Sequence, residues 1–128
     1  MPLSYRIDPS AEMVLIVGVG FITQSERIAA IQTWLRDPGF RPGPRTLCDF
    51  SEVTSTPTMK ELREIVSIVD EHAAAIGKKK LAVIASRPVT FGVARQFQTL
   101  ADFGPLDVEV FKDRRAALGW LRHGESQS

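Results

Sequence analysis

The stretch MVLIVGVG at residues 13–20, with TQSE close behind it at residues 23–26, decides the fold class of this chain. Val, Ile and Leu fill the first segment almost without interruption, which is typical of a strand covered on both faces of a sheet. The second segment is a capping box, in which Thr23 and Glu26 satisfy free backbone amides at a helix N-terminus. A buried strand that leads into a capped helix predicts an α/β protein with a mostly parallel sheet.

Strands and helices alternate along the rest of the chain. Alternating apolar residues at 3–7, with turn residues at 8–11, predict a first strand that pairs antiparallel with a second strand at 12–20. The predicted order is ββαβαβαβα, which gives a five-stranded, mostly parallel sheet with one antiparallel edge strand and four helices. The other expected elements are helices at 24–36, 58–76, 88–101 and 113–121 and strands at 45–51, 81–85 and 106–111. We expect a single domain over residues 1–123 and a frayed polar tail at 124–128.

The longest predicted helix, residues 58–76, begins at a second capping box formed by Thr58 and Glu61. Its apolar residues recur at helical spacing, and Gly77 is expected to end it as the C′ residue. The three lysines at 78–80 follow directly. We interpret them as cations that complement the negative end of the helix dipole, with phosphate binding as the alternative.

Composition and charge exclude several classes of protein. The 128 residues are 44% hydrophobic and carry 16 Lys and Arg against 15 Asp and Glu, a net charge of +1. That balance gives no basic surface for nucleic acid and no polybasic membrane anchor. The longest apolar run, residues 13–22, has about half the length of a membrane span. Cys48, the single cysteine, is expected to be a buried, inert thiol, and we expect a cytoplasmic protein without membrane insertion.

The chain shows no catalytic or metal-binding motif. The glycines within 18–20 lie between a strand and a helix, but Thr23 stands where a dinucleotide-binding loop needs its third glycine. We therefore interpret them as positions of close backbone packing. His72 and His123 have no second ligand at helical spacing. The sequence predicts no catalytic residue, no metal and no cofactor.

Two loops at the carboxyl ends of predicted parallel strands are candidate binding sites, because open α/β sheets bind ligands there. Residues 49–58 are rich in hydroxyl groups, and residues 86–95 place an arginine on each side of a helix start. Helix N-termini attract anions, and arginine can pair with them. The alternative is that Thr58 only caps its helix and that Arg87 is an ordinary surface residue. The predicted anion or ligand site comprises Ser51, Ser86, Arg87, Thr90 and Arg95.

Several short motifs resemble the STAS domain, the fold of sulfate-transporter domains and anti-sigma-factor antagonists. They are Thr23 after an apolar strand, Asp49-x-Ser51-x-Val53 in the third strand and the apolar residues 82–85 before a helix. Other segments are similar to small bacterial SpoIIAA-like proteins of the STAS/SEC14 type. These are YRID at 5–8, GFIT at 20–23, FGVAR at 91–95, VFKD at 110–113 and ALGWL at 117–121. The resemblance covers nearly the whole chain and implies a SpoIIAA-like domain without catalysis.

The resemblance also points to a loop that a protein partner could bind. In anti-sigma-factor antagonists, the loop after the third strand carries Asp-Ser-Ser-Gly, and a kinase phosphorylates a serine that caps the next helix. Here PTMK at residues 57–60 takes that place, so Thr58 is the matching hydroxyl, while the acidic residue and the glycine are missing. Together with Ser55 and Thr56, it forms the candidate phosphosite or partner loop.

Two functional hypotheses follow. The first is a non-enzymatic binding or regulatory module that docks a protein through residues 53–58 and the helix face around Lys60, Arg63 and Glu64. The second is a carrier of a small apolar or anionic ligand, in the manner of SEC14-like lipid binding. Its apolar pocket is expected between the helix at 88–101 and the sheet, gated by Phe91, Phe97 and Phe103. An enzyme is a third alternative, and the expected partners are a regulatory protein, a small ligand or a second copy in a homodimer.

Overall fold

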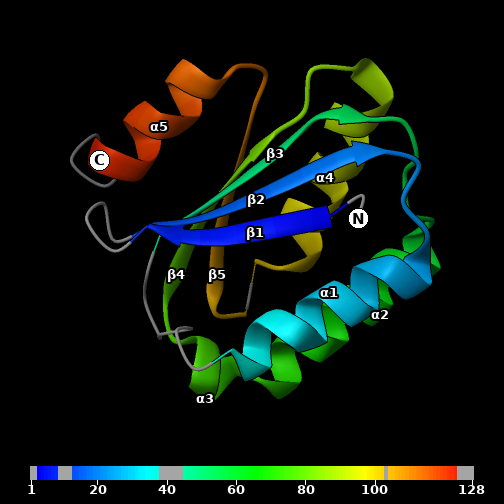
Figure 1. Ribbon diagram of the computed structural model, residues 1–128, viewed down its shortest axis with the longest axis vertical. Helices are drawn as coiled ribbons and strands as arrows, with labels where there is room; N and C mark the ends of the chain where they lie inside the picture. The colour runs from blue at the N-terminus through cyan, green and yellow to red at the C-terminus, as the bar shows by residue number, and fades with distance from the viewer. Residues whose placement is uncertain (1–2, 9–12, 38–44, 103, 124–128) are drawn as a thin grey trace.

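A five-stranded sheet with helices on both faces forms the centre of the computed structural model (Figure 1), which describes residues 3–8, 13–37, 45–102 and 104–123. Residues 9–11 of the expected turn, residues 38–44 and the expected tail at 124–128 lie outside these ranges. In chain order the elements are β1 (Leu3–Asp8), β2 (Met13–Gly20), α1 (Gln24–Arg36), β3 (Arg45–Val53), α2 (Met59–Glu71), α3 (Ala73–Ile76), β4 (Lys79–Ile84), α4 (Pro88–Leu100), β5 (Leu106–Phe111) and α5 (Arg114–His123).

The strands lie in the sheet in their order along the chain, β1-β2-β3-β4-β5. β1 pairs antiparallel with β2, with Leu3 opposite Gly18, and all other pairs are parallel. This confirms the predicted mostly parallel sheet with one antiparallel edge strand. Because each parallel pair needs a crossover, helices come to lie on both faces of the sheet.

The two faces of the sheet are covered unequally. α1, α2 and α3 lie on one side of the sheet and α5 on the other (Figure 1). The larger core cluster includes Ile16, Cys48 and Val83 of the sheet, with Trp34 of α1 and Phe97 of α4 packed against it. No helix in the described ranges is long and apolar enough to cross a membrane.

The smaller core cluster joins the second face of the sheet to α5. It buries Met13, Leu47, Ala82, Ile84, Ala117 and Leu121. Since α5 is the element that covers this face and it packs on β3, β4 and β5, the carboxyl half of β2 lies beyond its reach. Val17 and Val19 are therefore 39% and 53% exposed. The prediction that both faces of this strand are covered was wrong for this half.

The predicted helix at 58–76 is two helices, so the described residues form five helices and not four. The chain leaves helical geometry at His72, where φ is −109° and ψ is 20°. The His72 amide donates to the carbonyl of Val69, and its Nδ1 lies 2.9 Å from the carbonyl oxygen of Ile68. α3 then ends at Gly77, whose φ of 67° favours glycine, as the C′ prediction required.

Lys79 and Lys80 belong to a strand, which corrects the role predicted for them at a helix end, whereas Lys78 lies between the helix and the strand. β4 begins at Lys79 and not at Leu81, because the Lys79 amide donates to the Pro105 carbonyl and Lys79 lies opposite Leu106 of β5. Lys79 is buried, and the Lys80 ammonium lies 5.0 Å from the centre of the Trp120 ring. Two of the three lysines thus point to opposite faces of the sheet.

Close packing is confirmed at Gly18 but not at Gly20, where a Cβ atom would meet nothing within 4 Å. A Cβ atom at Gly18 would lie 2.9 Å from side-chain atoms of both Phe50 and Val53, which is too close for any side chain. Gly20 has a φ of 73°, a left-handed conformation that glycine adopts without strain. Gly18 therefore allows β2 to pack closely against β3, and Gly20 allows the chain to turn from β2 toward α1.

Both predicted capping boxes are present. The Thr58 hydroxyl accepts from the Glu61 amide at 3.1 Å, and the Glu61 carboxylate accepts from the Thr58 amide at 2.8 Å. Thr23 and Glu26 form the same pair of bonds at the start of α1. At α5, the Asp113 carboxylate accepts from the Ala116 amide, as expected for a helix cap. These local interactions fix where the helices begin.

The cap at Thr58 can be tested by substitution. Thr58→Ala should lower the free energy of unfolding by about 1 kcal/mol, because the Glu61 amide loses its acceptor. Thr58→Asn should cost much less, since its side-chain oxygen can cap the helix. Denaturant unfolding measures both values. Equal losses in the two variants would show that the cap does not stabilise α2.

Candidate functional site

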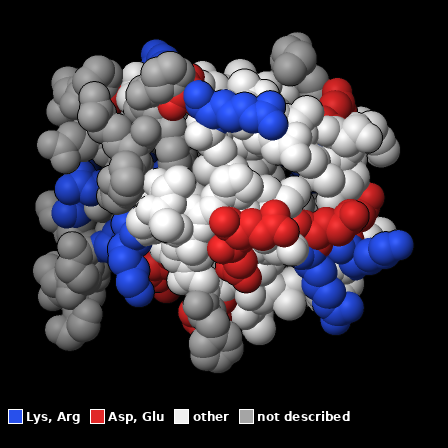
Figure 2. All heavy atoms as spheres, turned by 90° about the horizontal axis from the view of Figure 1, so that it is seen from below, with Lys and Arg blue, Asp and Glu red and all other residues white. Residues whose placement is uncertain are grey.

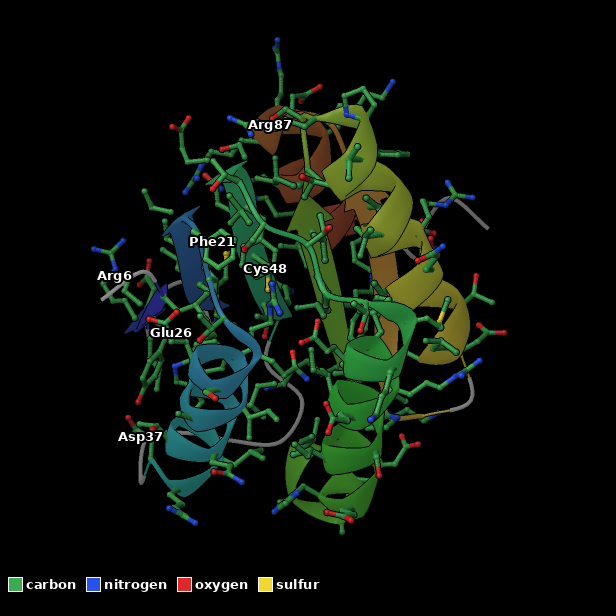
Figure 3. All side chains as sticks on the ribbon, turned by 90° about the vertical axis from the view of Figure 1, so that its right-hand side faces the viewer. Arg6, Phe21, Glu26, Asp37, Cys48 and Arg87 are labelled. Carbon is green, nitrogen blue, oxygen red and sulfur yellow. The ribbon has the colours of Figure 1, made fainter. Side chains whose placement is uncertain are left out.

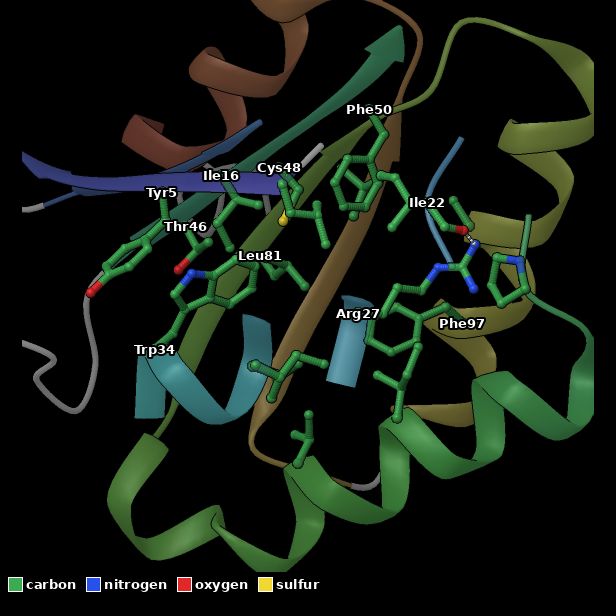
Figure 4. A pocket seen from close by; sticks show the side chains of 18 of the residues that line it. Tyr5, Ile16, Ile22, Arg27, Trp34, Thr46, Cys48, Phe50, Leu81 and Phe97 are labelled. Carbon is green, nitrogen blue, oxygen red and sulfur yellow. Dashed lines mark hydrogen bonds between the residues drawn. The ribbon is translucent and has the colours of Figure 1, made fainter. Parts of the chain in front are cut away.

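An apolar cavity lies between the sheet and helices α1, α2 and α4 (Figure 4). Its volume is about 240 Å³, and nearly all of its wall is apolar. Side chains from all five strands contribute, including Tyr5, Ile16, Cys48, Leu81 and Leu106. It is larger than the roughly 150 Å³ engineered cavity that binds benzene in another protein.

The cavity exists because two of the three helices above it stand off from the sheet. Neither α1 nor α4 contributes a fully buried side chain, whereas α2 buries Leu62 and Val69. Trp34 of α1 packs edge-on against Tyr5, with ring centres 5.6 Å apart. This pair of rings fills the space between α1 and β1 at one end of the cavity.

The cavity is partly open to solvent, and nearly all of its wall is apolar. Removing apolar surface from water is favourable by about 25 cal/mol per Å². A molecule with an apolar body would therefore gain free energy by covering this wall.

Ser55 ties the two turns that lead into α1 and α2. Its hydroxyl donates to the Ile22 carbonyl at 2.9 Å and accepts from the Ile22 amide at 2.8 Å. Gln24 adds a bond from its amide group to the Glu61 carbonyl at 3.0 Å. The N-termini of both helices are therefore fixed to each other at one end of the cavity.

The bonds that join Ser55 to Ile22 and Gln24 to Glu61 are called the clamp below. Arg27 lies beside them, and its hydrogen-bond partners are groups of the same clamp. Its guanidinium donates to the Ile22 carbonyl at 3.0 Å and to the Gln24 side-chain oxygen at 3.2 Å, and it lies 4.0 Å from the Glu61 carboxylate. Burial lowers the pKa of Arg27, and the charge of Glu61 opposes that shift. Arg27 therefore serves to join α1 to the turns beside it.

The other end of the cavity holds two buried polar side chains, Thr46 of β3 and Lys79 of β4. Figure 4 shows Thr46 near Tyr5 and Trp34, at the end away from Arg27. Burial lowers the pKa of Lys79 to about 8. Burial likewise raises the pKa of the neighbouring Cys48 thiol to about 12, which agrees with the predicted inert thiol.

Sequence reasoning missed this end of the cavity, although a signal was present. Lys79 alternates with Leu81 and Val83, and a period of two places all three on one face of a strand. Thr46 occupies the same kind of position, two residues before Cys48. The lysine run hid this pattern, because three consecutive cations suggest a solvated segment.

The structure separates the residues of the predicted partner loop. Ser55, Thr56 and Pro57 line the cavity, and the Ser55 hydroxyl is engaged in the clamp. Thr58 is exposed at the N-terminus of α2. The loop thus has an inner side against the cavity and an outer side toward solvent.

The predicted anion residues are not gathered at one point. Ser51 donates its hydroxyl to Asp49 at 2.6 Å, and Thr90 lines the cavity. Ser86 and Arg87 are exposed, and Figure 3 shows Arg87 at the top, away from Cys48. Arg95 is eight residues further along the same helix, about 12 Å in rise. The geometry does not assemble these five residues into one pocket.

The three phenylalanines expected to gate a pocket lie in different places. Phe97 lines the cavity. Phe91 is not part of its wall and has the Lys112 ammonium 5.4 Å from its ring centre. Phe103 lies outside the described residues. The pocket is also wider than expected, since α1 and α2 contribute to it as well as α4.

Comparison with known proteins identifies the fold. No protein-family model and no curated protein matches the chain. A similar solved structure is that of an uncharacterized DUF3478-family protein from Shewanella loihica PV-4 with a SpoIIAA-like fold. The similarity covers 93% of both chains, with a TM-score of 0.61 and 20% sequence identity. This chain has a SpoIIAA-like fold. The resemblance seen in the short sequence motifs is therefore confirmed for the SpoIIAA-like architecture.

The remaining chemistry of this SpoIIAA-like domain is sparse. Within the described ranges, no three His, Cys, Asp or Glu side chains gather closely enough to hold a metal ion. On the face seen in Figure 2, acidic and basic side chains are interspersed with uncharged ones. The cavity is therefore the feature on which a functional argument can rest.

The buried lysine predicts a pH dependence of stability. The folded-state pKa of about 8 lies below the ordinary 10.5, so between these values the unfolded chain binds a proton that the folded chain releases. Stability should therefore rise by about 1.4 kcal/mol from about pH 7 to pH 9, and Lys79→Met should lack this rise. Denaturant unfolding at each pH measures it. The raised pKa of Cys48 acts in the opposite sense above about pH 9, so the comparison ends there. The same slope in both proteins would contradict burial of a charged Lys79.

Proposed function

We propose that this protein is a non-enzymatic binding module that takes up a small molecule with an apolar body in the cavity beneath α1, α2 and α4. The observation that carries the proposal is the cavity itself, about 240 Å³ of apolar space inside a domain of 128 residues. Apolar pockets with a few polar groups are the usual form of small-molecule sites. This is the carrier hypothesis, with a pocket that borders α1 and α2 as well as α4.

The wall chemistry supports binding in preference to catalysis. The Cys48 thiol lies in the wall, and burial keeps it protonated by raising its pKa to about 12. Arg27 and Ser55, the polar groups at the clamp, are hydrogen-bonded to the backbone. A buried free thiol also suits the reducing cytoplasm. The proposal therefore assigns no reaction to the cavity.

The cavity proposal predicts the effect of filling the space. Ala94 of α4 lies in the wall, whereas Ala29 of α1 is exposed. n-Octane should raise the melting temperature of the natural protein, because a ligand that binds only the folded state stabilises it. Ala94→Leu should reduce this rise and Ala29→Leu should not, since leucine at position 94 occupies part of the cavity. Thermal unfolding with and without n-octane measures both. The absence of any rise in the natural protein would contradict the proposal.

A regulatory role is a second candidate, favoured by the two-sided loop at 53–58. Ser55, Thr56 and Pro57 touch the cavity, while Thr58 and the neighbouring Lys60 and Arg63 are exposed. A ligand in the cavity would contact the inner side of the segment whose outer side can meet a protein. The module would then report ligand binding to its partner through this loop.

The link between cavity and loop is testable by hydrogen exchange. n-Octane should slow amide exchange at residues 53–58, because the filled cavity supports this segment and reduces its local opening. Amides of α5 lie on the opposite face of the sheet and should change less. Mass spectrometry of peptides from the two segments gives the comparison. Slower exchange in α5 alone, or equal slowing in both segments, would show that residues 53–58 do not respond specifically to a ligand in the cavity.

A further inference from the structure

The cavity has one polar end built from two strands. Thr46 and Lys79 are the buried polar side chains of the described residues, 3% and 6% exposed, and both are in the cavity wall. Thr46 lies opposite Leu81, two residues along β4 from Lys79. Because alternate residues of a strand share a face, Thr46 and Lys79 are diagonal neighbours on the cavity face of the sheet.

The Thr46 hydroxyl makes no hydrogen bond to any group in the described residues. Buried hydroxyl groups normally have a partner, because burying one without a partner is unfavourable. β-Branched threonine and valine have nearly the same shape, so packing alone does not require an oxygen here. The hydroxyl is therefore available to a group that enters the cavity.

A buried lysine and a buried threonine at diagonal positions of the cavity wall are complementary to a particular ligand chemistry. Lys79 supplies positive charge in a poorly hydrated place, where an anion is attracted more strongly than in water. Thr46 can donate one hydrogen bond to an oxygen of the same anion. The remaining wall is apolar and suits a hydrocarbon chain.

The clamp end of the cavity does not offer the same chemistry. Arg27 already donates to the Ile22 carbonyl and the Gln24 side chain, and Glu61 lies 4.0 Å away. A second carboxylate there would meet the charge of Glu61. The anionic end of a ligand is thus better placed at Thr46 and Lys79.

We propose that the ligand of the cavity is an amphipathic monocarboxylate, whose carboxylate accepts a hydrogen bond from Thr46 beside the charge of Lys79 while its chain fills the apolar space. This inference rests on the proposed function. It goes further by naming the class of ligand and the two residues that select it.

Three probes of equal chain length separate the contributions: n-octane, octan-1-ol and octanoate. Titration by calorimetry should give octanoate the lowest Kd, octan-1-ol an intermediate value and n-octane the highest.

Two variants test the residues. Thr46→Val should raise the Kd of octanoate and of octan-1-ol about tenfold, since one hydrogen bond is lost, and should leave the Kd of n-octane unchanged. Lys79→Met should remove the advantage of octanoate over octan-1-ol. Thr46→Val conserves shape and removes an unpartnered hydroxyl, so it should fold at least as stably as the natural protein.

The outcomes distinguish this inference from the function on which it rests. If none of the probes binds, the proposed function itself fails. If all three bind equally well, the cavity is real but its polar end selects nothing, and the inference is overturned. An octanoate preference that survives both substitutions would place the carboxylate elsewhere, as at Arg27, and would overturn it too.

Discussion

The reciprocal hydrogen bonds between the Ser55 hydroxyl and the backbone of Ile22 are the constraint on which the rest of the site depends. Two crossover helices enter the same face of the sheet at neighbouring strands, and this pair of bonds joins their entry points. α1 and α2 are thereby held at one end. Since α1 contributes no fully buried side chain, its position over the sheet comes from this joint and from Trp34 at its other end.

Local signals predicted the architecture well. Thr23, Thr58 and Asp113 each mark a helix start through an oxygen three residues from the amide it satisfies, a relation that sequence spacing expresses directly. The mostly parallel sheet and its antiparallel edge strand followed from the alternation of elements. The Shewanella loihica protein has a similar fold at only 20% sequence identity.

The features that the sequence did not predict depend on how closely helices and strands pack against each other. Whether Val17 is covered depends on the reach of α5. How closely α1 approaches the sheet depends on the Trp34 and Tyr5 rings at one end and on the Ser55–Ile22 bonds at the other. Lys79 was misplaced because its burial requires the pairing of β4 with β5, a contact between distant parts of the chain. The break at His72 arose from a side chain that competes for a helix carbonyl, which an apolar stripe does not reveal.

The apolar wall of the cavity also affects the heat capacity of the protein. Unfolding raises the heat capacity in proportion to the apolar surface that it newly exposes to water. A molecule that enters between the sheet and α1 covers part of that wall. Because burial of apolar surface on binding gives a negative heat-capacity change, the occupied fold should show a larger heat-capacity increase when it unfolds.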